Sequence, residues 1–531
     1  MTIRRVVTWS ALAIGVILVV AAIAALRYFP TDRDIRRRVE TLLSEHFDAT
    51  VELKDLHVTL LPSPRIDGGG LKLFPHNRPS TTPLLSVDRF HATATWHDLL
   101  QPTHRVENLD LQGLRITIAP KTEDTGVRGK EHGGCQGERL HPQTAPHETA
   151  KSSPVLVAHL SAPGTTITMV PREQKKLPRV FTIESLSVER ITLDQPLDFE
   201  AVLTNPIPRG EIRTKGRFGP WVKSDPGLAA VSGTYRFDKA DLGTINGIGG
   251  ILSSDGRFDG VLEQILVEGK TDTPDFSLDT ARHPMPLTTE FKACVDGTDG
   301  DTYLDEVKAR LASSPILAKG KVEGRVGVDG RTIVLDARVD GGRIDDFLRL
   351  AVKANPPLLK GRVSLTTSVK LPPSKRSVIE RLQLNGQFGL HEARFTPRPV
   401  QEKMDEFSRR GQGRVEDGDV ANVASDFKGH FTLSDGVLHL PDLAFAIPGA
   451  TVAVHGTYGL VNEQIAFEGA VRTQAKLSEM TTGFKSLLLK VIDPLFTRKD
   501  AGTVFPIHVS GTRSHPQFGV DVKGALTRKV K

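Results

Sequence analysis

The sequence predicts a mainly β protein in which one N-terminal transmembrane helix precedes a long, mostly antiparallel, twisted sheet with a few short helices. Three observations predict it. Apolar and polar residues alternate in short runs over most of the chain, which is typical of half-buried strands. The 48 glycines and 34 prolines lie between these runs as turn residues. Helical patterns of about 10–15 residues do not alternate with the strands, which disfavours a βαβ fold.

The helix is expected at Val6–Leu26, VVTWSALAIGVILVVAAIAAL, which contains no charged residue. About 21 residues at ~1.5 Å each give a length of about 30 Å, enough to cross a bilayer core. A signal peptide would have an apolar run of about 7–15 residues and a small-residue cleavage site, for which Ala22-Ile23-Ala24 is the candidate. We interpret residues 1–30 as an uncleaved anchor. We expect the bulk of the chain outside the cytoplasm, although Arg36–Arg38 and other following arginines oppose the positive-inside rule.

Composition excludes one class of partner. The 531 residues carry a formal net charge of +6 and are 6% aromatic, with one basic block at Arg36–Arg38. Nucleic-acid binding requires a clustered basic face with interleaved aromatic residues, so we expect no nucleic-acid partner. The two cysteines, Cys135 and Cys294, lie far apart in the chain. They predict no disulfide framework and do not decide the compartment.

The region after the anchor, residues 31–120, is expected to begin with a helix and continue in strands. Apolar residues recur near the 3.6-residue period from Thr31 to Phe47. Alternation then begins at Val51, with a phase slip at Lys54-Asp55 that indicates a bulge. Trp96–Leu100 fits one helical turn. The alternating apolar residues of the last strands in this region are Leu109, Leu111, Leu114 and Ile116.

Two polar stretches interrupt the alternation. Lys121–Ser153 has few apolar residues and no period, so we expect a disordered insertion at 121–153. Strand patterns fill the middle region, 154–400, with one short helix expected at Asp346–Val352. Residues 401–425 are again polar, and we interpret them as a linker.

The C-terminal region, 426–531, combines strands with one amphipathic helix. Strands are expected at His430–Leu433, Val437–Leu440, Thr451–Tyr458, Gln464–Arg472, Val504–Ser510 and Gln517–Val522. A helix from Ser478 to Ile492 carries an apolar stripe at helical spacing. The stripe consists of Phe484, Leu487, Leu488, Val491 and Ile492.

Both ends of the chain resemble the AsmA family of envelope proteins. At the N-terminal end the resemblance rests on the anchor and on VELKDLHVTLLPSPRI, PLLSVDRFHATATWHDLL and VENLDLQGLRITIAP. At the C-terminal end it rests on SDGVLHLPDLAFAIPGATVAVHGTYGL, IAFEGAVRTQAKLSEM and GTVFPIHVSGTRSHPQFGVDV. The order and spacing of these pieces carry the resemblance. The long middle region and the insertion depart from the family pattern.

The resemblance implies a function. It implies a single-pass inner-membrane protein, anchored by Val6–Leu26, with its bulk in the periplasm and a taco-like β-groove. The groove would bind phospholipid and help move it between envelope membranes, supporting outer-membrane assembly. An alternative is a scaffold or chaperone for outer-membrane proteins that acts through strand edges without lipid carriage. The groove-lining candidates are Leu109, Leu111, Leu114, Ile116, Phe484, Leu487, Leu488, Val491 and Ile492.

The sequence contains no recognisable catalytic motif, so we expect no enzyme, cofactor or metal site. Gly247–Gly250 lacks the helix and the Lys-Ser/Thr pair of a phosphate-binding loop. The acidic run Asp296, Asp299, Asp301 and Asp305 lacks the bidentate glutamate of an EF-hand, and we interpret it as a solvated hairpin loop.

Overall fold

The computed structural model covers much of the sheet that the sequence predicts. The residues it describes are 36–37, 40–41, 44, 49–59, 62–75, 83–100, 104–118, 155–169, 179–191, 195–219, 228–297, 300–324, 328, 330–414, 422–475 and 503–520. The expected anchor Val6–Leu26, the insertion Lys121–Ser153 and the expected helix from Ser478 to Ile492 lie outside them. Over the described ranges, no helix is both long and apolar enough to span a membrane.

Twenty-seven strands of the described residues form one sheet. They are β1 (Ala49–Glu52), β2 (Asp55–Thr59), β3 (Arg65–Pro75), β4 (Leu85–Thr93), β5 (His104–Gln112), β6 (Arg115–Ile118), β7 (Val155–Ser161), β8 (Thr165–Met169), β9 (Arg179–Ile191), β10 (Leu197–Pro206), β11 (Arg209–Phe218), β12 (Ala230–Asp241), β13 (Ile248–Gly249), β14 (Ile251–Val261), β15 (Gln264–Leu278), β16 (Met285–Val295), β17 (Thr302–Leu311), β18 (Ser314–Gly324), β19 (Arg331–Arg343), β20 (Leu359–Leu371), β21 (Gln383–Phe395), β22 (Ser425–Ser434), β23 (Val437–Ile447), β24 (Ala450–Gly459), β25 (Gln464–Thr473), β26 (Thr503–Thr512) and β27 (His515–Val520). The helical segments with assigned bounds are α3 (Trp96–Leu100), the 3-10 turn η3 (Leu242–Thr244), α4 (Ile344–Ala351), α5 (Val378–Arg381) and α6 (Arg398–Gly411).

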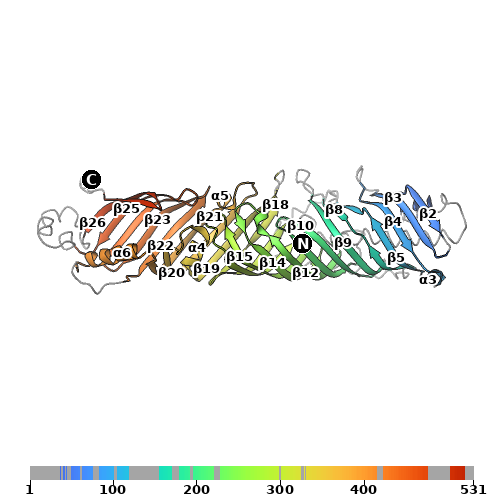
Figure 1. The fold of residues 1–531 in the computed structure, drawn as a ribbon, viewed down its shortest axis with the longest axis horizontal. Coiled ribbons are helices and arrows are strands. Elements are labelled where there is room, and N and C mark those ends of the chain that lie inside the picture. The colour runs from blue at the N-terminus through green and yellow to red at the C-terminus, as the bar shows by residue number, and fades with distance from the viewer. Residues whose placement is uncertain are drawn as a thin grey trace, which may run out of the picture.

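Strands that follow one another along the chain are mostly neighbours, so the sheet is a long meander. β1 and β2 both pair with β3 and together form one interrupted edge strand. β5 and β6 run parallel to β7 and β8. From β9 to β27 every pairing is antiparallel. Figure 1 shows the result, an elongated body with β2–β5 at one end and β23–β26 at the other.

The predicted mainly β, mostly antiparallel sheet is confirmed, and most predicted elements are present with slightly different bounds. The phase slip at Lys54-Asp55 is the break between β1 and β2, and the helical turn at Trp96–Leu100 is α3. The short helix expected at Asp346–Val352 is α4. The stretch 401–425 differs from the expected linker, because α6 occupies its first part and packs on the sheet.

Register and burial divide the sheet into two faces. In β20, Val363, Leu365 and Val369 are buried or half-buried, whereas the alternate residues Lys360 and Thr366 are exposed. We call the side of the first set the inner face and the other the outer face. In the N-terminal half the inner face belongs to a single buried cluster that runs from β1 to β16.

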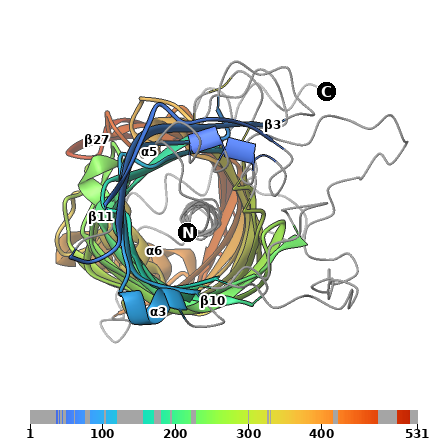
Figure 2. The same cartoon turned by 90° about the vertical axis from the view of Figure 1, so that its right-hand side faces the viewer.

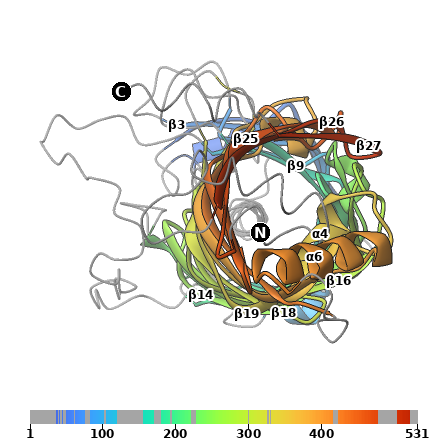
Figure 3. The ribbon, with the colours of Figure 1, turned by 90° about the vertical axis from the view of Figure 1, so that its left-hand side faces the viewer.

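The sheet coils until its two margins meet at one point. β12 and β20 run in opposite directions, because an odd number of antiparallel pairings separates them, so their C-terminal ends lie on opposite margins. Yet Asn246, after β12, donates from Nδ2 to the Lys375 carbonyl at 2.9 Å, and Val378 N donates to the Asn246 carbonyl at 2.9 Å. A flat sheet could not bring these residues together. Views along the long axis show the sheet curling around it (Figures 2 and 3).

We name the two margins by their helices. The α6 margin carries the strand ends joined through η3, α4 and α6, and the α5 margin carries those joined through α5. The contact of Asn246 with Lys375 and Val378 joins the two margins, and we call it the margin bridge.

Candidate functional site

The inner face joins apolar side chains of many strands into continuous rows. One row crosses β19 to β23, and each member is the register partner of the next: Leu335, Val369, Leu384, Leu433 and Leu438. A second row crosses β21 to β25 in the same way: Leu390, Phe427, Phe445, Val452 and Val471. Such rows form an apolar strip that runs across the strands, along the sheet.

Five phenylalanines gather on this face in β21, β22 and β23. The rings of Phe427 and Phe445 are stacked with centroids 5.2 Å apart, and Phe395 meets Phe427 edge-on at 6.4 Å. Phe388 lies 6.2 Å from Phe431 in a tilted arrangement. These separations are those of favourable aromatic pairs. The cluster is a wide apolar surface near the α6 margin.

Many residues of the C-terminal half of the inner face are only half-buried. Leu335, Val369, Leu384, Phe388 and Phe445 all retain some exposed surface. The described residues form one sheet, so no second sheet covers them. Half-exposed apolar rows on a concave sheet are the feature that an apolar chain could cover.

The structure places only part of the predicted groove set. Leu109, Leu111 and Leu114 are 0% exposed and Ile116 is 1% exposed, and all four belong to the large buried cluster on the inner face of the N-terminal half. The other set, Phe484, Leu487, Leu488, Val491 and Ile492, lies outside the described residues. As lipid-contacting residues, both sets stay a prediction.

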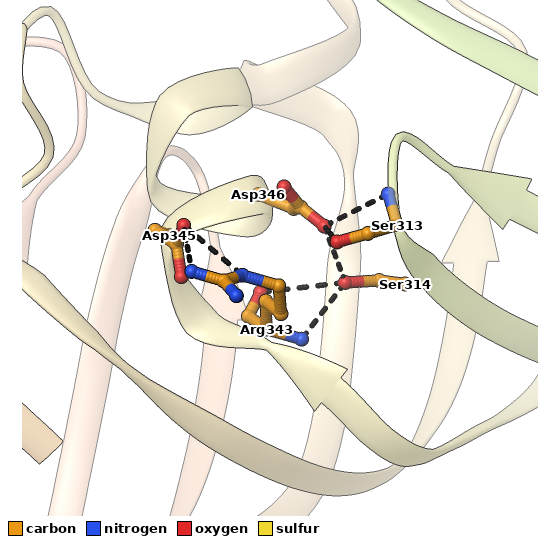
Figure 4. Close-up of polar contacts among 5 residues, drawn as sticks. All are labelled: Ser313, Ser314, Arg343, Asp345 and Asp346. Atoms are coloured by element: carbon orange, nitrogen blue, oxygen red, sulfur yellow. Dashed lines mark hydrogen bonds and ion pairs between the residues drawn. The ribbon is translucent and has the colours of Figure 1, made fainter.

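Helix α4 is fixed beside the inner face by one buried carboxylate. Asp346 Oδ2 accepts hydrogen bonds from the hydroxyls of Ser313 and Ser314, each at 2.7 Å, and from Ser313 N at 3.2 Å (Figure 4). Ser314 Oγ in turn accepts from Arg343 N at 2.9 Å. This network ties the start of α4 to the turn between β17 and β18. Ile344 and Phe347 of α4 then pack against the inner-face cluster of Val339, Val363, Leu390 and Ala393.

Helix α6 is held at the margin by a polar face. Gln401, Asp405 and Ser408 are buried. Asp405 accepts from the backbone N–H groups of Asn422 and Val423, each at 2.9 Å. The Ser408 hydroxyl donates to the Pro448 carbonyl at 2.7 Å. These bonds satisfy loop and turn groups that a purely apolar helix face would leave unpaired.

The outer face carries charged cross-strand pairs. Arg257 Nη2 lies 2.5 Å from Glu268 Oε2, and this bond holds the pKa of the Glu268 carboxyl below its ordinary value. Lys270 pairs with Glu290 at 3.3 Å. On the inner face, burial raises the pKa of Tyr235, whose hydroxyl lies 3.1 Å from Ser254 Oγ and stays neutral. The outer face therefore carries charged groups that water solvates, whereas the inner face carries groups that are removed from water.

The described residues offer little that resembles a reactive centre. Two hollows have volumes of about 510 and 720 Å³; charged side chains such as Arg257 and Lys292 dominate the lining of the first, and the second mixes polar residues with apolar ones such as Leu365 and Phe388. No group of three or more His, Cys, Asp or Glu within the described ranges is arranged to hold a metal ion. Asp301, from the acidic run, accepts from Arg331 Nη1 at 2.6 Å and from Gly324 N at 3.0 Å.

Three features of the structure were not predicted from the sequence. The phenylalanine cluster had a partial signal, because Phe427 and Phe431 of β22 are four positions apart and share a face, but pairing across strands was needed to bring its members together. The margin bridge joins residues 129 positions apart, and the sequence contains no signal that predicts it. Cys294 is disulfide-bonded, and the only other cysteine of the sequence, Cys135, lies outside the described residues.

Comparison with known proteins identifies no relative of this chain. The chain matches no protein-family model, no curated protein and no solved structure.

Proposed function

We propose that this chain is an AsmA-like envelope protein that carries phospholipid along its inner face. In this proposal Val6–Leu26 anchors it in the inner membrane, and the sheet lies in the periplasm. Acyl tails contact the apolar rows while headgroups stay in water. Movement of lipid between the envelope membranes then supports outer-membrane assembly. The observation that carries the proposal is the continuous, half-buried apolar inner face of the C-terminal half.

The physical argument concerns apolar surface. Each methylene removed from water contributes about 0.8 kcal/mol, so an acyl chain laid along such rows gains stability without any specific polar contact. The phenylalanine cluster offers flat faces for the same purpose. Strands about 4.8 Å apart give this meander a length on the order of 100 Å. Such a length fits movement of a lipid along the sheet better than binding of a ligand in one pocket.

The disulfide at Cys294 supports the proposed compartment. Structural disulfides persist in oxidising environments such as the bacterial periplasm and are rare in the cytosol. A periplasmic sheet would therefore keep this bond, whereas a cytosolic one would have it reduced.

The test is lipid analysis of the full chain purified from membranes in mild detergent. We expect phospholipid to co-purify and to be identified by mass spectrometry. Val369→Asp places a charge on the inner face of β20, and Ser368→Asp places the same charge on the exposed outer face of the same strand. Because a carboxylate disfavours a neighbouring acyl chain, Val369→Asp should lower the lipid bound per folded molecule, and Ser368→Asp should not.

The melting temperature of both variants controls for folding. Equal lipid content in a folded Val369→Asp variant and its Ser368→Asp control would contradict carriage on the inner face. Absence of lipid from the wild-type chain would favour the scaffold alternative, in which strand edges bind outer-membrane proteins.

A further inference from the structure

Two adjacent strands carry like charges directly opposite each other on the outer face near the α6 margin. Lys360 of β20 is the register partner of Arg394 of β21. Arg362, two residues further, faces Arg343 of β19 on one side and His391 on the other. Like charges in directly opposed positions repel and destabilise a sheet. Elsewhere on this face opposite charges meet, as in the pair of Arg257 with Glu268.

Acidic neighbours neutralise only part of this charge. Arg362 lies 3.5 Å from Glu392, and Arg343 lies 3.1 Å from Asp345. Among the described residues, no carboxylate forms an ion pair with Lys360 or Arg394. Both side chains are exposed. We call Lys360 and Arg394 the doublet. It presents two exposed cations that form no ion pair with a described carboxylate.

Exposed apolar side chains lie beside the doublet. Leu358 and Val400 are each 37% exposed. Thr396 N donates to the Leu358 carbonyl at 3.0 Å, which places Leu358 next to the segment that leads from Arg394 into α6. Val400 lies in the first turn of α6, two residues after the exposed Arg398, whose Nε pairs with Glu402 Oε1 at 3.0 Å. We call this set the basic corner: Leu358, Lys360, Arg362, Arg394, Arg398 and Val400.

We propose that the basic corner docks on the surface of a membrane that contains anionic phospholipid. Exposed apolar residues among cations suit the boundary between anionic headgroups and acyl chains, and each nearby cation strengthens such contact. A small anion is a poorer fit, because the six residues do not line either of the two hollows described above. The corner lies in the C-terminal half, away from the end that holds β2–β5 (Figure 1). Docking here is independent of lipid carriage on the inner face.

The experiment uses the full chain, captured on a sensor surface through a C-terminal tag. Vesicles of phosphatidylcholine alone, or mixed with phosphatidylglycerol, are passed over it at low and high salt. The readout is the extra binding that phosphatidylglycerol causes, because an apolar N-terminal stretch would bind both vesicles alike. Neutralising both residues of the doublet, Lys360→Gln with Arg394→Gln, should weaken this extra binding about 25-fold, from roughly fivefold per cation.

The matched control is Lys319→Gln with Lys370→Gln. Both lysines are exposed, and Lys370 lies on the same outer face of β20 at its other end. The control has the same net charge as the test variant and should keep wild-type binding. Leu358→Ser with Val400→Ser should weaken binding at both salt concentrations. Equal binding by the doublet variant and its control, or wild-type binding that does not increase with phosphatidylglycerol, would overturn the proposal. Either result would point to an acidic protein or to no partner at this surface.

Discussion

At the scale of single residues, His430 and Asp442 form a cross-strand pair on the outer face between β22 and β23. The imidazole Nδ1 lies 2.8 Å from Asp442 Oδ2, and His430 N donates to Oδ1 at 2.8 Å. The hydrogen bond from the His430 side chain holds the pKa of the Asp442 carboxyl below its ordinary value of 3.8. The folded state therefore favours the ionised carboxylate more than the unfolded state does.

This pair predicts a loss of local stability in acid. Because the pKa is lowered on folding, the pairing stabilises the strands above the ordinary value and is lost as the pH falls through the lowered one. We expect hydrogen-exchange protection of β22 and β23, corrected for intrinsic rates, to fall below about pH 4. His430→Gln should weaken this pH dependence, and His439→Gln, an exposed histidine of β23, should not. Identical profiles for both variants would show that the pair contributes nothing.

At the scale of elements, alternation in the sequence was enough to predict strands and their two faces. Val363, Leu365 and Val369 of β20 show why, since they are two and four positions apart and therefore face the same side. Helix α6 was missed because its buried face is polar. Gln401, Asp405 and Ser408 are spaced as a helix face, but an apolar stripe is the signal that sequence reading uses. Their partners, backbone groups near Val423 and Pro448, cannot be recognised before folding.

Helix α4 supplies the prediction at this scale. Asp346→Ala removes three hydrogen bonds and leaves the fully buried Ser314 without its carboxylate, which should destabilise the region by about 2–4 kcal/mol. Asp345→Ala removes an ion pair with the half-exposed Arg343 and should cost less than about 1 kcal/mol. Thermal melting and hydrogen exchange in α4 measure both. Comparable losses in the two neighbours would mean that the network in Figure 4 does not fix the helix.

At the scale of the whole molecule, the meander is close to one-dimensional, because each strand pairs mainly with its neighbours in the chain. Such architectures unfold in parts unless a distant contact couples them. The sequence predicted the long sheet, because many short strands with few helices between them disfavour a fold with alternating helices and strands. It could not predict the coil, because coiling depends on twist accumulated over many strands and on a contact between Asn246 and the connection that holds Lys375.

Gly247 tests whether the margin bridge holds the coil closed. Its φ of +103° suits glycine, and a Cβ there would lie 2.5 Å from Val378 N, the atom that donates to Asn246. Gly341 has a φ of +68° with nothing within 4 Å of an added Cβ, so Gly341→Ala carries backbone strain alone and should cost about 1 kcal/mol. Gly247→Ala adds a collision with backbone and should cost about 2–4 kcal/mol. If the bridge couples the two margins, Gly247→Ala should also speed amide exchange at Val378 and widen the particle in small-angle X-ray scattering, while Gly341→Ala changes neither. A Gly247→Ala protein with unchanged scattering and unchanged exchange at Val378 would show that strand twist alone keeps the sheet coiled.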